Sequence, residues 1–291
     1  MSLGTSAVVI LCIYPILWIM IAAFLAITRK KGTLVMNHTL PPEALDDFAV
    51  RSVIRGTRRR LWLSGIVLSV FVIFFFFIPY ESVALTAWLS WSLFAIAVPY
   101  LVWLGGSRKI KKLMAERQWP KASEDAHWFG CMIYYNPSDS HRMVDMRLGK
   151  GTTFNFAYLG AKLLAVFCIL CLASLPFFGA WLIWEDFTPI SVSVSVQALE
   201  LDHCGSDTEI YYDEVEEVAL IKEMPSHRRT SGYEMTWIDK GRFKVEGYGR
   251  CRVYVDSRDD AILVLKTADE TFLVSLPEEK TAKEVIRHIP L

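Results

Sequence analysis

The chain holds few residues whose types and spacing could carry out chemistry. Cys168 and Cys171 form a C-x-x-C pair, a spacing that can serve redox chemistry or bind a metal. The pair lies in an apolar run without acidic or His neighbours, so packing is the favoured interpretation. The six His residues show no metal-ligand spacing, and residues 149–152 (GKGT) lack the spacing of a phosphate-binding loop. The sequence therefore predicts no catalytic residue, no metal and no cofactor.

Glu185 and Asp186 are adjacent carboxylates that directly follow an apolar run. Such a pair at a membrane surface could supply the acid and the base of an enzyme that acts on lipid or peptide. Adjacent acidic residues in this position more often mark the solvated end of a membrane span. A membrane enzyme is therefore the alternative hypothesis for this chain and not the first.

The elements that position these residues are dominated by four apolar runs within residues 1–189. None of the runs contains Asp, Glu, Lys, Arg or His, and each is long enough at about 1.5 Å per residue to cross a hydrocarbon core of about 30 Å. The sequence therefore predicts four transmembrane helices. Because the runs hold no ionisable group, a transporter or channel is disfavoured. The predicted spans are residues 6–28, 61–80, 83–104 and 163–184.

The cations predict how these spans are oriented. Residues 29–60 hold eight Lys or Arg and residues 105–162 hold ten, whereas residues 81–82 hold none. The positive-inside rule places both basic loops in the cytoplasm. We therefore expect a multi-pass protein of the cell membrane, with the N-terminus and the C-terminal domain outside the cytoplasm.

Residues 190–291 form the second predicted domain, which is mainly β. Residues 191–196 (SVSVSV) alternate with period two, six further short strand-like runs follow between turn signals, and residues 278–288 have the charge pattern of a helix. The domain carries 13 basic and 20 acidic residues, which argues against binding of nucleic acid. Seven strands and a closing helix indicate a small barrel or sandwich.

Several stretches carry a family resemblance. Residues 211–218, 224–232, 240–243 and 247–250 resemble the bacterial pleckstrin-homology domain at the C-terminus of an uncharacterised family of membrane proteins from Gram-positive bacteria. Residues 128–139 and 149–157 are similar to a loop of the same proteins. The resemblance implies a pleckstrin-homology-like roll with a C-terminal helix, and it suggests a function in peptide stress or immunity.

A candidate loop motif lies in the second predicted cytoplasmic loop. Its aromatic pair and turn-forming residues favour a compact cover over the helix ends, and a ligand or partner site is the alternative. The motif residues are Tyr134, Tyr135, Asn136, Asp139 and Asn155.

The predicted outer domain offers one candidate binding loop. Residues 222–232 are rich in Arg and bounded by turn formers, and we take Arg228, Arg229 and Tyr233 as the candidate binding residues, with a solvated hairpin connection as the alternative. Cys204 and Cys251 are the only cysteines of this domain, and a disulfide between them is permitted outside the cytoplasm. Whether the two cysteines meet is left open by the spacing.

Together these features predict a membrane-anchored binding or sensing protein. Its expected partners are the lipid bilayer and a protein or peptide, with no nucleic acid. No feature of the sequence identifies the ligand.

Overall fold

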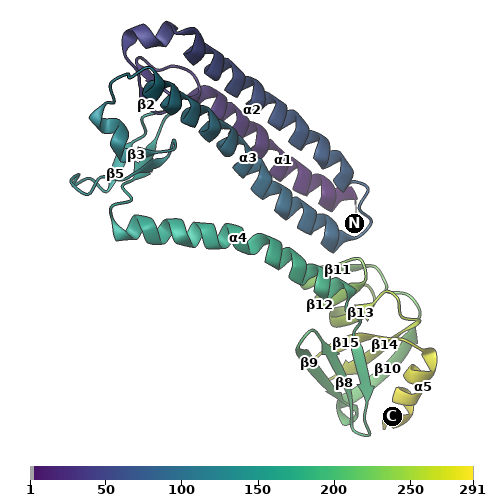
Figure 1. Ribbon diagram of the computed structural model, residues 1–291. Coiled ribbons are helices and arrows are strands. Elements are labelled where there is room, and N and C mark those ends of the chain that lie inside the picture. The colour runs from purple at the N-terminus through teal and green to yellow at the C-terminus, as the bar shows by residue number, and fades with distance from the viewer. Residues whose placement is uncertain (1–2, 291) are drawn as a thin grey trace. The chain divides into compact units, whose positions relative to one another are not determined.

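The computed structural model describes the backbone of residues 3–290 and the side chains of residues 14–290 (Figure 1). The chain divides by its contacts into two units, and each is described by itself. One unit comprises Ser2–Phe77 and Ala87–Phe177, and the other comprises Ile78–Thr86 and Phe178–Leu291. The second unit therefore contains the β domain together with the end of one long helix and the start of another.

Four long helices are present in the described residues. They are α1 (Leu3–Ile27), α2 (Phe48–Phe75), α3 (Glu81–Glu116) and α4 (Leu159–Phe187). Side chains from α1, α2 and α3 form a packed core in which Phe24, Leu61 and Trp103 are each at most 2% exposed. A Cβ atom on Gly106 of α3 would lie 2.4 Å from Thr57 Oγ1 of α2, so glycine permits the close approach of these two helices.

Two helices, α3 and α4, are long and apolar enough to cross a membrane, and the described side chains of α1, Tyr14–Ile27, form an apolar stretch. The helix limits differ from the predicted spans. α2 begins at Phe48, inside the predicted loop 29–60, and α3 continues beyond residue 104 to Glu116. The basic segments are helical because Asp47 caps α2, accepting a hydrogen bond from Ala49 N at 2.7 Å, and because Arg and Lys are good helix formers.

Short elements connect the helices of this unit. The strands pair in three antiparallel ladders, β1 with β2, β3 with β4 and β5 with β6. The elements are β1 (Leu34–Val35), β2 (His38–Thr39), η1 (Pro42–Asp46), η2 (Ser123–His127), β3 (Trp128–Phe129), β4 (Ile133–Tyr134), β5 (Met143–Asp145) and β6 (Thr152–Phe154).

The C-terminal unit is built from two sheets and a closing helix. A three-stranded antiparallel sheet has the order β7-β8-β9, and a six-stranded sheet has the order β10-β14-β15-β13-β12-β11, in which only β13 and β15 are parallel. The elements are β7 (Ser191–Val194), β8 (Ala198–His203), β9 (Ser206–Tyr211), η3 (Tyr212–Glu214), β10 (Val215–Ile221), β11 (His227–Glu234), β12 (Ile238–Val245), β13 (Gly249–Asp256), β14 (Ala261–Thr267), β15 (Thr271–Leu276) and α5 (Glu279–His288).

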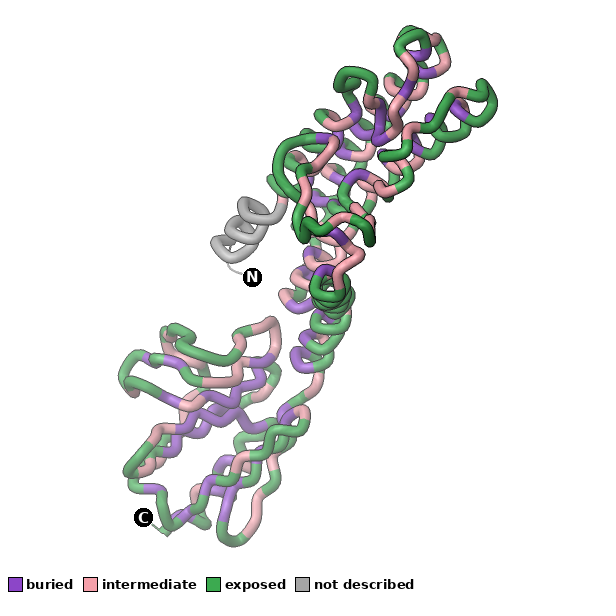
Figure 2. Tube along the Cα trace, turned by 90° about the vertical axis from the view of Figure 1, so that its left-hand side faces the viewer, coloured by how far each residue is buried: buried purple, intermediate pink, exposed green. Residues whose placement is uncertain are grey.

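Buried residues follow one another along the central strands of the six-stranded sheet (Figure 2). Because successive side chains of a strand point to opposite faces, both faces of this sheet are covered. Leu263 and Leu265 of β14 pack with Leu199 of the three-stranded sheet and Val285 of α5 in one core, and Phe243 belongs to a second core. The predicted mainly β domain with a closing helix is confirmed. The domain has nine strands instead of the seven predicted, and the two additional strands are β8 and β11.

Candidate functional site

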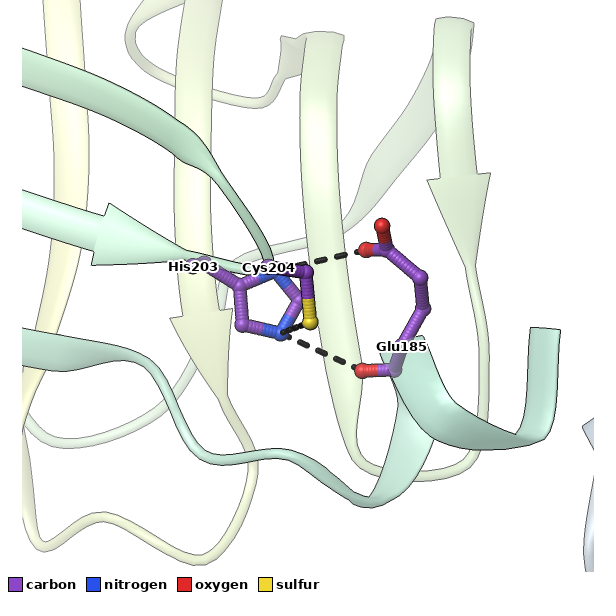
Figure 3. A group of neighbouring side chains, drawn as sticks. All are labelled: Glu185, His203 and Cys204. Atoms are coloured by element: carbon purple, nitrogen blue, oxygen red, sulfur yellow. Dashed lines mark hydrogen bonds and ion pairs between the residues drawn. The ribbon is translucent and has the colours of Figure 1, made fainter. Parts of the chain in front are cut away.

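Polar side chains gather inside the C-terminal unit at the end of α4. Glu185 is 6% exposed and His203 is 2% exposed, although both are ionisable. Cys204 lies beside them in the turn after β8, and Tyr233 of β11 and Lys240 of β12 complete the group. We call these five residues the junction cluster. Figure 3 shows Glu185, His203 and Cys204 with their mutual contacts.

The side chains of the junction cluster form hydrogen bonds with one another and with nearby backbone carbonyl groups. The Tyr233 hydroxyl donates to Glu185 Oε2 and lies 3.2 Å from His203 Nδ1. His203 Nε2 lies 3.0 Å from the carbonyl oxygen of Thr188 and 3.2 Å from that of Glu185. Carbonyl oxygens only accept, so Nε2 carries a hydrogen. The Lys240 ammonium donates to the His203 carbonyl oxygen at 3.0 Å. Each of the four residues Tyr233, Glu185, His203 and Lys240 therefore has a hydrogen-bond partner within the cluster.

The surroundings shift two pKa values in the junction cluster upward. Burial and the hydrogen bond to Glu185 raise the pKa of Tyr233, so its hydroxyl stays protonated and remains a donor. Burial also raises the pKa of Cys204, which keeps this residue a thiol instead of a reactive thiolate. Both side chains therefore stay protonated at neutral pH.

The junction cluster also brings together residue types that bind metals. One ligand atom each from Glu185, His203 and Cys204 lies within 4.8 Å of the other two, and zinc accepts this set of donors. However, the Lys240 ammonium lies 3.3 Å from His203 Nδ1, and a protein cation at that distance opposes a metal cation. The arrangement of these side chains fits a hydrogen-bonded network that links α4 to the β domain better than a metal centre.

Asp186 makes a second buried connection at the end of α4. Its side chain is fully buried and accepts hydrogen bonds from Ser82 Oγ at 2.6 Å and from Trp237 N at 2.9 Å. Glu185 and Asp186, the carboxylates considered for a membrane enzyme, are therefore both held inside hydrogen-bonded networks.

The candidate binding residues Arg228, Arg229 and Tyr233 do not form one site. The predicted loop is strand β11 from His227 onward, at one edge of the six-stranded sheet. Successive side chains of a strand point to opposite faces, so Arg228 and Arg229 face different sides, and Tyr233 belongs to the junction cluster. The loop prediction was wrong because charged residues and Gly232 obscured a strand whose partner, β12, lies further along the chain.

The register of β11, β12 and β13 instead assembles cations that the sequence analysis did not connect. Arg228 lies directly opposite Lys244, and Lys244 lies directly opposite Arg250. Arg242 and Arg252 form a second opposed pair on the same face. We call these five residues the cationic face. The i, i+2 spacing of 242 with 244 and of 250 with 252 was the available sequence signal.

A hollow of about 460 Å³ lies on the cationic face. Arg242, Arg250 and Arg252 contribute to its lining, together with the hydroxyl residues Thr230 and Ser231 and the acidic residues Asp269 and Glu270.

Two of the five charges of the cationic face take part in ion pairs. Glu270 pairs with Arg242 at 3.6 Å and with Arg252 at 3.7 Å. Arg228, Lys244 and Arg250 form no ion pair with any residue that the structure describes. Like charges placed directly opposite each other destabilise a sheet. The like charges of this row therefore oppose each other in the folded protein.

The two cysteines of the domain are free, and the candidate disulfide is not formed. Cys251 of β13 is buried in the core that contains Phe243, whereas Cys204 lies in the turn of the three-stranded sheet beside His203. The two thiols belong to different sheets with different surroundings, which explains why they do not pair.

The loop motif of the helical unit is centred on Asn155, which is fully buried. Asn155 Oδ1 accepts hydrogen bonds from Asn136 N and Ala157 N, both at 3.1 Å, and its Nδ2 donates to the Asn136 carbonyl oxygen at 2.9 Å. Asp139 accepts a hydrogen bond from the Tyr134 hydroxyl at 3.0 Å. Four motif residues thus share one network, in which they hold the loop together.

Tyr135 lies apart from that network. Its backbone N–H donates to the His127 carbonyl oxygen at 2.8 Å, and the Lys162 ammonium lies 5.7 Å from the centre of its ring.

The carboxylate of Asp139 is kept in its charged form. The backbone N–H of His141 holds the pKa of Asp139 below its usual range, so this carboxylate remains an acceptor. These contacts favour the structural interpretation of the motif.

Comparison with known proteins identifies the β domain. Residues 190–283 match a family described as bacterial PH domain, a match that starts just before β7 and ends within α5. Comparisons with curated proteins and with solved structures gave no match. The chain therefore contains a bacterial PH domain, which indicates a binding or interaction module. The resemblance of the whole chain to membrane proteins of Gram-positive bacteria stays a prediction.

Proposed function

We propose that this protein is a membrane-anchored binding module whose PH domain captures an acidic segment of a protein or peptide. The membrane anchor is supported by α3 and α4, which are long and apolar enough to span a bilayer. Only 6% of the most apolar stretch of α4 is buried, and side chains such as Phe167, Ile169 and Leu170 are each more than 60% exposed. An apolar surface of this extent requires a hydrocarbon environment or a protein partner.

The proposed topology has four spans, formed by the apolar parts of α1, α2, α3 and α4. The excess of Lys and Arg in residues 29–60 and 105–162 supports a cytoplasmic position for both loops and an outer position for the PH domain. Labelling of intact cells with a membrane-impermeant maleimide tests this proposal. We expect Ser206→Cys to react and Ser140→Cys to stay unlabelled until the membrane is opened. The reverse pattern would place the PH domain in the cytoplasm.

The observation that carries the binding function is the unpaired row of Arg228, Lys244 and Arg250. Neighbouring strands lie about 4.8 Å apart and alternate residues along a strand about 6.7 Å apart, so the cationic face is a grid of charges at these spacings. An extended segment along β12 with acidic residues at alternate positions matches the spacing of Arg242 and Lys244, and Arg228 and Arg250 flank Lys244 on the neighbouring strands. The domain as a whole carries 20 acidic and 13 basic residues in 190–291, so a long polyanion such as a nucleic acid would be repelled beyond the hollow.

A peptide titration tests the binding function. The probe is a synthetic peptide of alternating Glu and Ser, added to the full-length protein in lipid nanodiscs at low ionic strength. Replacing two unpaired cations, Lys244→Gln with Arg250→Gln, should weaken binding by about tenfold, because each close charge pair contributes up to about 1 kcal/mol.

The matched control removes two cations elsewhere in the domain. Lys280 and Arg287 are exposed on α5, and neither forms an ion pair with a described residue. The Lys280→Gln, Arg287→Gln variant changes the net charge by the same amount and should keep the parental affinity. Equal losses in both double variants would show general charge attraction and would contradict a site on the cationic face.

A further inference from the structure

The acidic residues of the PH domain are concentrated in one part of its sequence. Residues 190–221 hold eight acidic side chains and no Lys or Arg, whereas residues 222–291 hold 12 acidic and 13 basic side chains. All eight are exposed, and among the described residues only Glu217 forms an ion pair, with Lys266 at 2.7 Å. The eight residues are Glu200, Asp202, Asp207, Glu209, Asp213, Glu214, Glu216 and Glu217.

Residues 213–217 of the acidic segment lie at the β10 edge of the six-stranded sheet, and the cationic face covers the three strands at the opposite end, β13, β12 and the edge strand β11. The other four acidic residues belong to the three-stranded sheet. β10, which carries Glu216 and Glu217, is one edge strand of the six-stranded sheet, and Asp213 and Glu214 immediately precede it in η3. β11, which carries Arg228, is the other edge strand. We call residues 213–217 the acidic edge.

Opposite charges at the two edges have a physical consequence. Edge strands are usually protected from pairing with another copy by charged side chains. Charge of one sign on both edges would repel a second copy, whereas negative charge on one edge and positive charge on the other attracts it. The charge distribution therefore favours contact between copies in a head-to-tail orientation.

We propose that the partner of the cationic face is the acidic edge of a second copy of this chain. The inference rests on the proposed function, since it names the acidic segment that the cationic face binds. The contact is heterologous, so each copy offers a cationic face to one neighbour and an acidic edge to another, and the copies form a row or a ring. Anchoring in one membrane would confine the copies to a plane and raise their effective concentration, so modest pairwise attraction suffices.

Charge reversal in full-length protein tests this inference. Donor-labelled and acceptor-labelled copies are reconstituted together in neutral lipid vesicles, and energy transfer is measured at low and high salt. In the first variant Arg228, Lys244 and Arg250 become Glu, which makes the face over β11, β12 and β13 acidic like the β10 edge. In the second variant Asp213, Glu214 and Glu216 become Lys, which makes both edges basic.

The inference predicts a specific pattern of association. Energy transfer between parental copies should exceed that of a diluted control and fall with salt, because exposed ion pairs are screened. Each variant mixed with itself should associate about tenfold less tightly, whereas the two variants mixed together should regain the parental signal. A chain that carries both sets of reversals should again associate with itself, and circular dichroism of each variant confirms that its sheets are folded.

The outcomes separate this inference from the proposed function. Parental copies that transfer no more energy than the diluted control would overturn self-association, as would a mixture of the two variants that fails to regain the signal. The acidic peptide probe is titrated against the same samples. Peptide binding by the parent but not by the first variant would then leave the binding function standing with a different partner.

Discussion

The junction cluster and the cationic face share two strands, β11 and β12, but differ in whether their charged and polar groups have partners. Tyr233 and Lys240 are directly opposed at one part of the strand pair, and their polar atoms are satisfied by His203 and Glu185. Arg228 and Lys244 are directly opposed at the other part, and no described acidic residue pairs with them. Polar groups that satisfy each other stabilise the fold, whereas like charges left in opposition destabilise it and are available to a partner.

Two glycines separate these parts of the strand pair. Gly232 has a φ of +93° and lies directly opposite Gly241, and a Cβ atom on Gly232 would be 2.2 Å from the Lys240 carbonyl oxygen. The strands can approach this closely only without side chains. The register that opposes Arg228 to Lys244 therefore depends on this glycine pair.

The largest expected effect follows from breaking the glycine pair. Gly232→Ala should lower the free energy of unfolding by about 3–4 kcal/mol, because it adds a backbone clash to an unfavourable φ. The control is Gly205→Ala, where φ is +77° but no atom lies within 4 Å of the added Cβ, so only the backbone strain of about 1 kcal/mol applies. Denaturant unfolding of the full chain in detergent measures both, and equal losses would show that the close approach is unimportant.

The second effect comes from opening the junction cluster. Tyr233→Phe removes the hydroxyl that donates to the buried Glu185 carboxylate and should cost about 2 kcal/mol of stability. Tyr211→Phe is the matched control, because its hydroxyl donates to Glu209 at 2.6 Å at the exposed surface and should cost less than about 0.5 kcal/mol. The same unfolding assay compares them. If the two variants lose the same stability, the cluster does not hold the domain together.

An acidic pair on the same strands predicts a smaller, pH-dependent effect. Asp239 lies directly opposite Glu234, and burial followed by the charge of Glu234 raises the pKa of Asp239 to about 6, although His227 and Arg229 act in the opposite direction. Between the unfolded pKa of about 4 and this value, the folded protein holds a proton that the unfolded chain has lost. Stability should therefore fall as pH rises from about 4 to 6 and then level off.

Asp239→Asn isolates this effect. The variant should be more stable than the parent at pH 7 and should lose the part of the slope between pH 4 and 6 that Asp239 causes. Thermal unfolding at several pH values measures both. A parental slope that persists unchanged in the variant would assign the pH dependence to other groups.

The smallest expected effect is a gain in stability. Lys244→Gln removes the central charge of the row between Arg228 and Arg250, so it should stabilise the domain by about 0.5 kcal/mol. Lys280→Gln on α5 removes a charge with one like-charged neighbour, Lys283 at i+3, and one of opposite charge, Glu284 at i+4, so the two effects oppose each other and stability should change by less. A loss of stability in Lys244→Gln would contradict the assignment of repulsion within the cationic face.

The sequence predicted those features that depend on local patterns. Alternation in residues 191–196 and the turn signals indicated the β domain, and the apolar run at 163–184 indicated α4. Strand β11 was not predicted because its charged residues and Gly232 are typical of a loop, and its pairing with β12 cannot be recognised from the sequence. The limits of α2 were missed because Arg-rich helix and apolar helix continue without interruption through residue 60.

The candidate site was less accessible to prediction because it depends on register. Tyr233 was identified as a candidate, but its true neighbours, Glu185 and His203, come from α4 and β8 and meet it only in the folded domain. Arg228 was identified too, yet its relation to Lys244 and Arg250 follows from strand pairing alone. The sequence shows which charged residues alternate within one strand. It does not show which of them lie opposite each other on neighbouring strands.

The central claim is that the unpaired cations of the cationic face bind a partner, whereas the junction cluster stabilises the fold. One titration tests this claim most directly. The acidic peptide probe is titrated against the parent, the Lys244→Gln, Arg250→Gln variant and the Tyr233→Phe variant, all full length in nanodiscs and all folded at the assay temperature. The account predicts that the double variant binds about tenfold more weakly while being at least as stable as the parent, and that Tyr233→Phe keeps its affinity while losing stability. Parental affinity in the double variant, or lost affinity in a folded Tyr233→Phe variant, would contradict it.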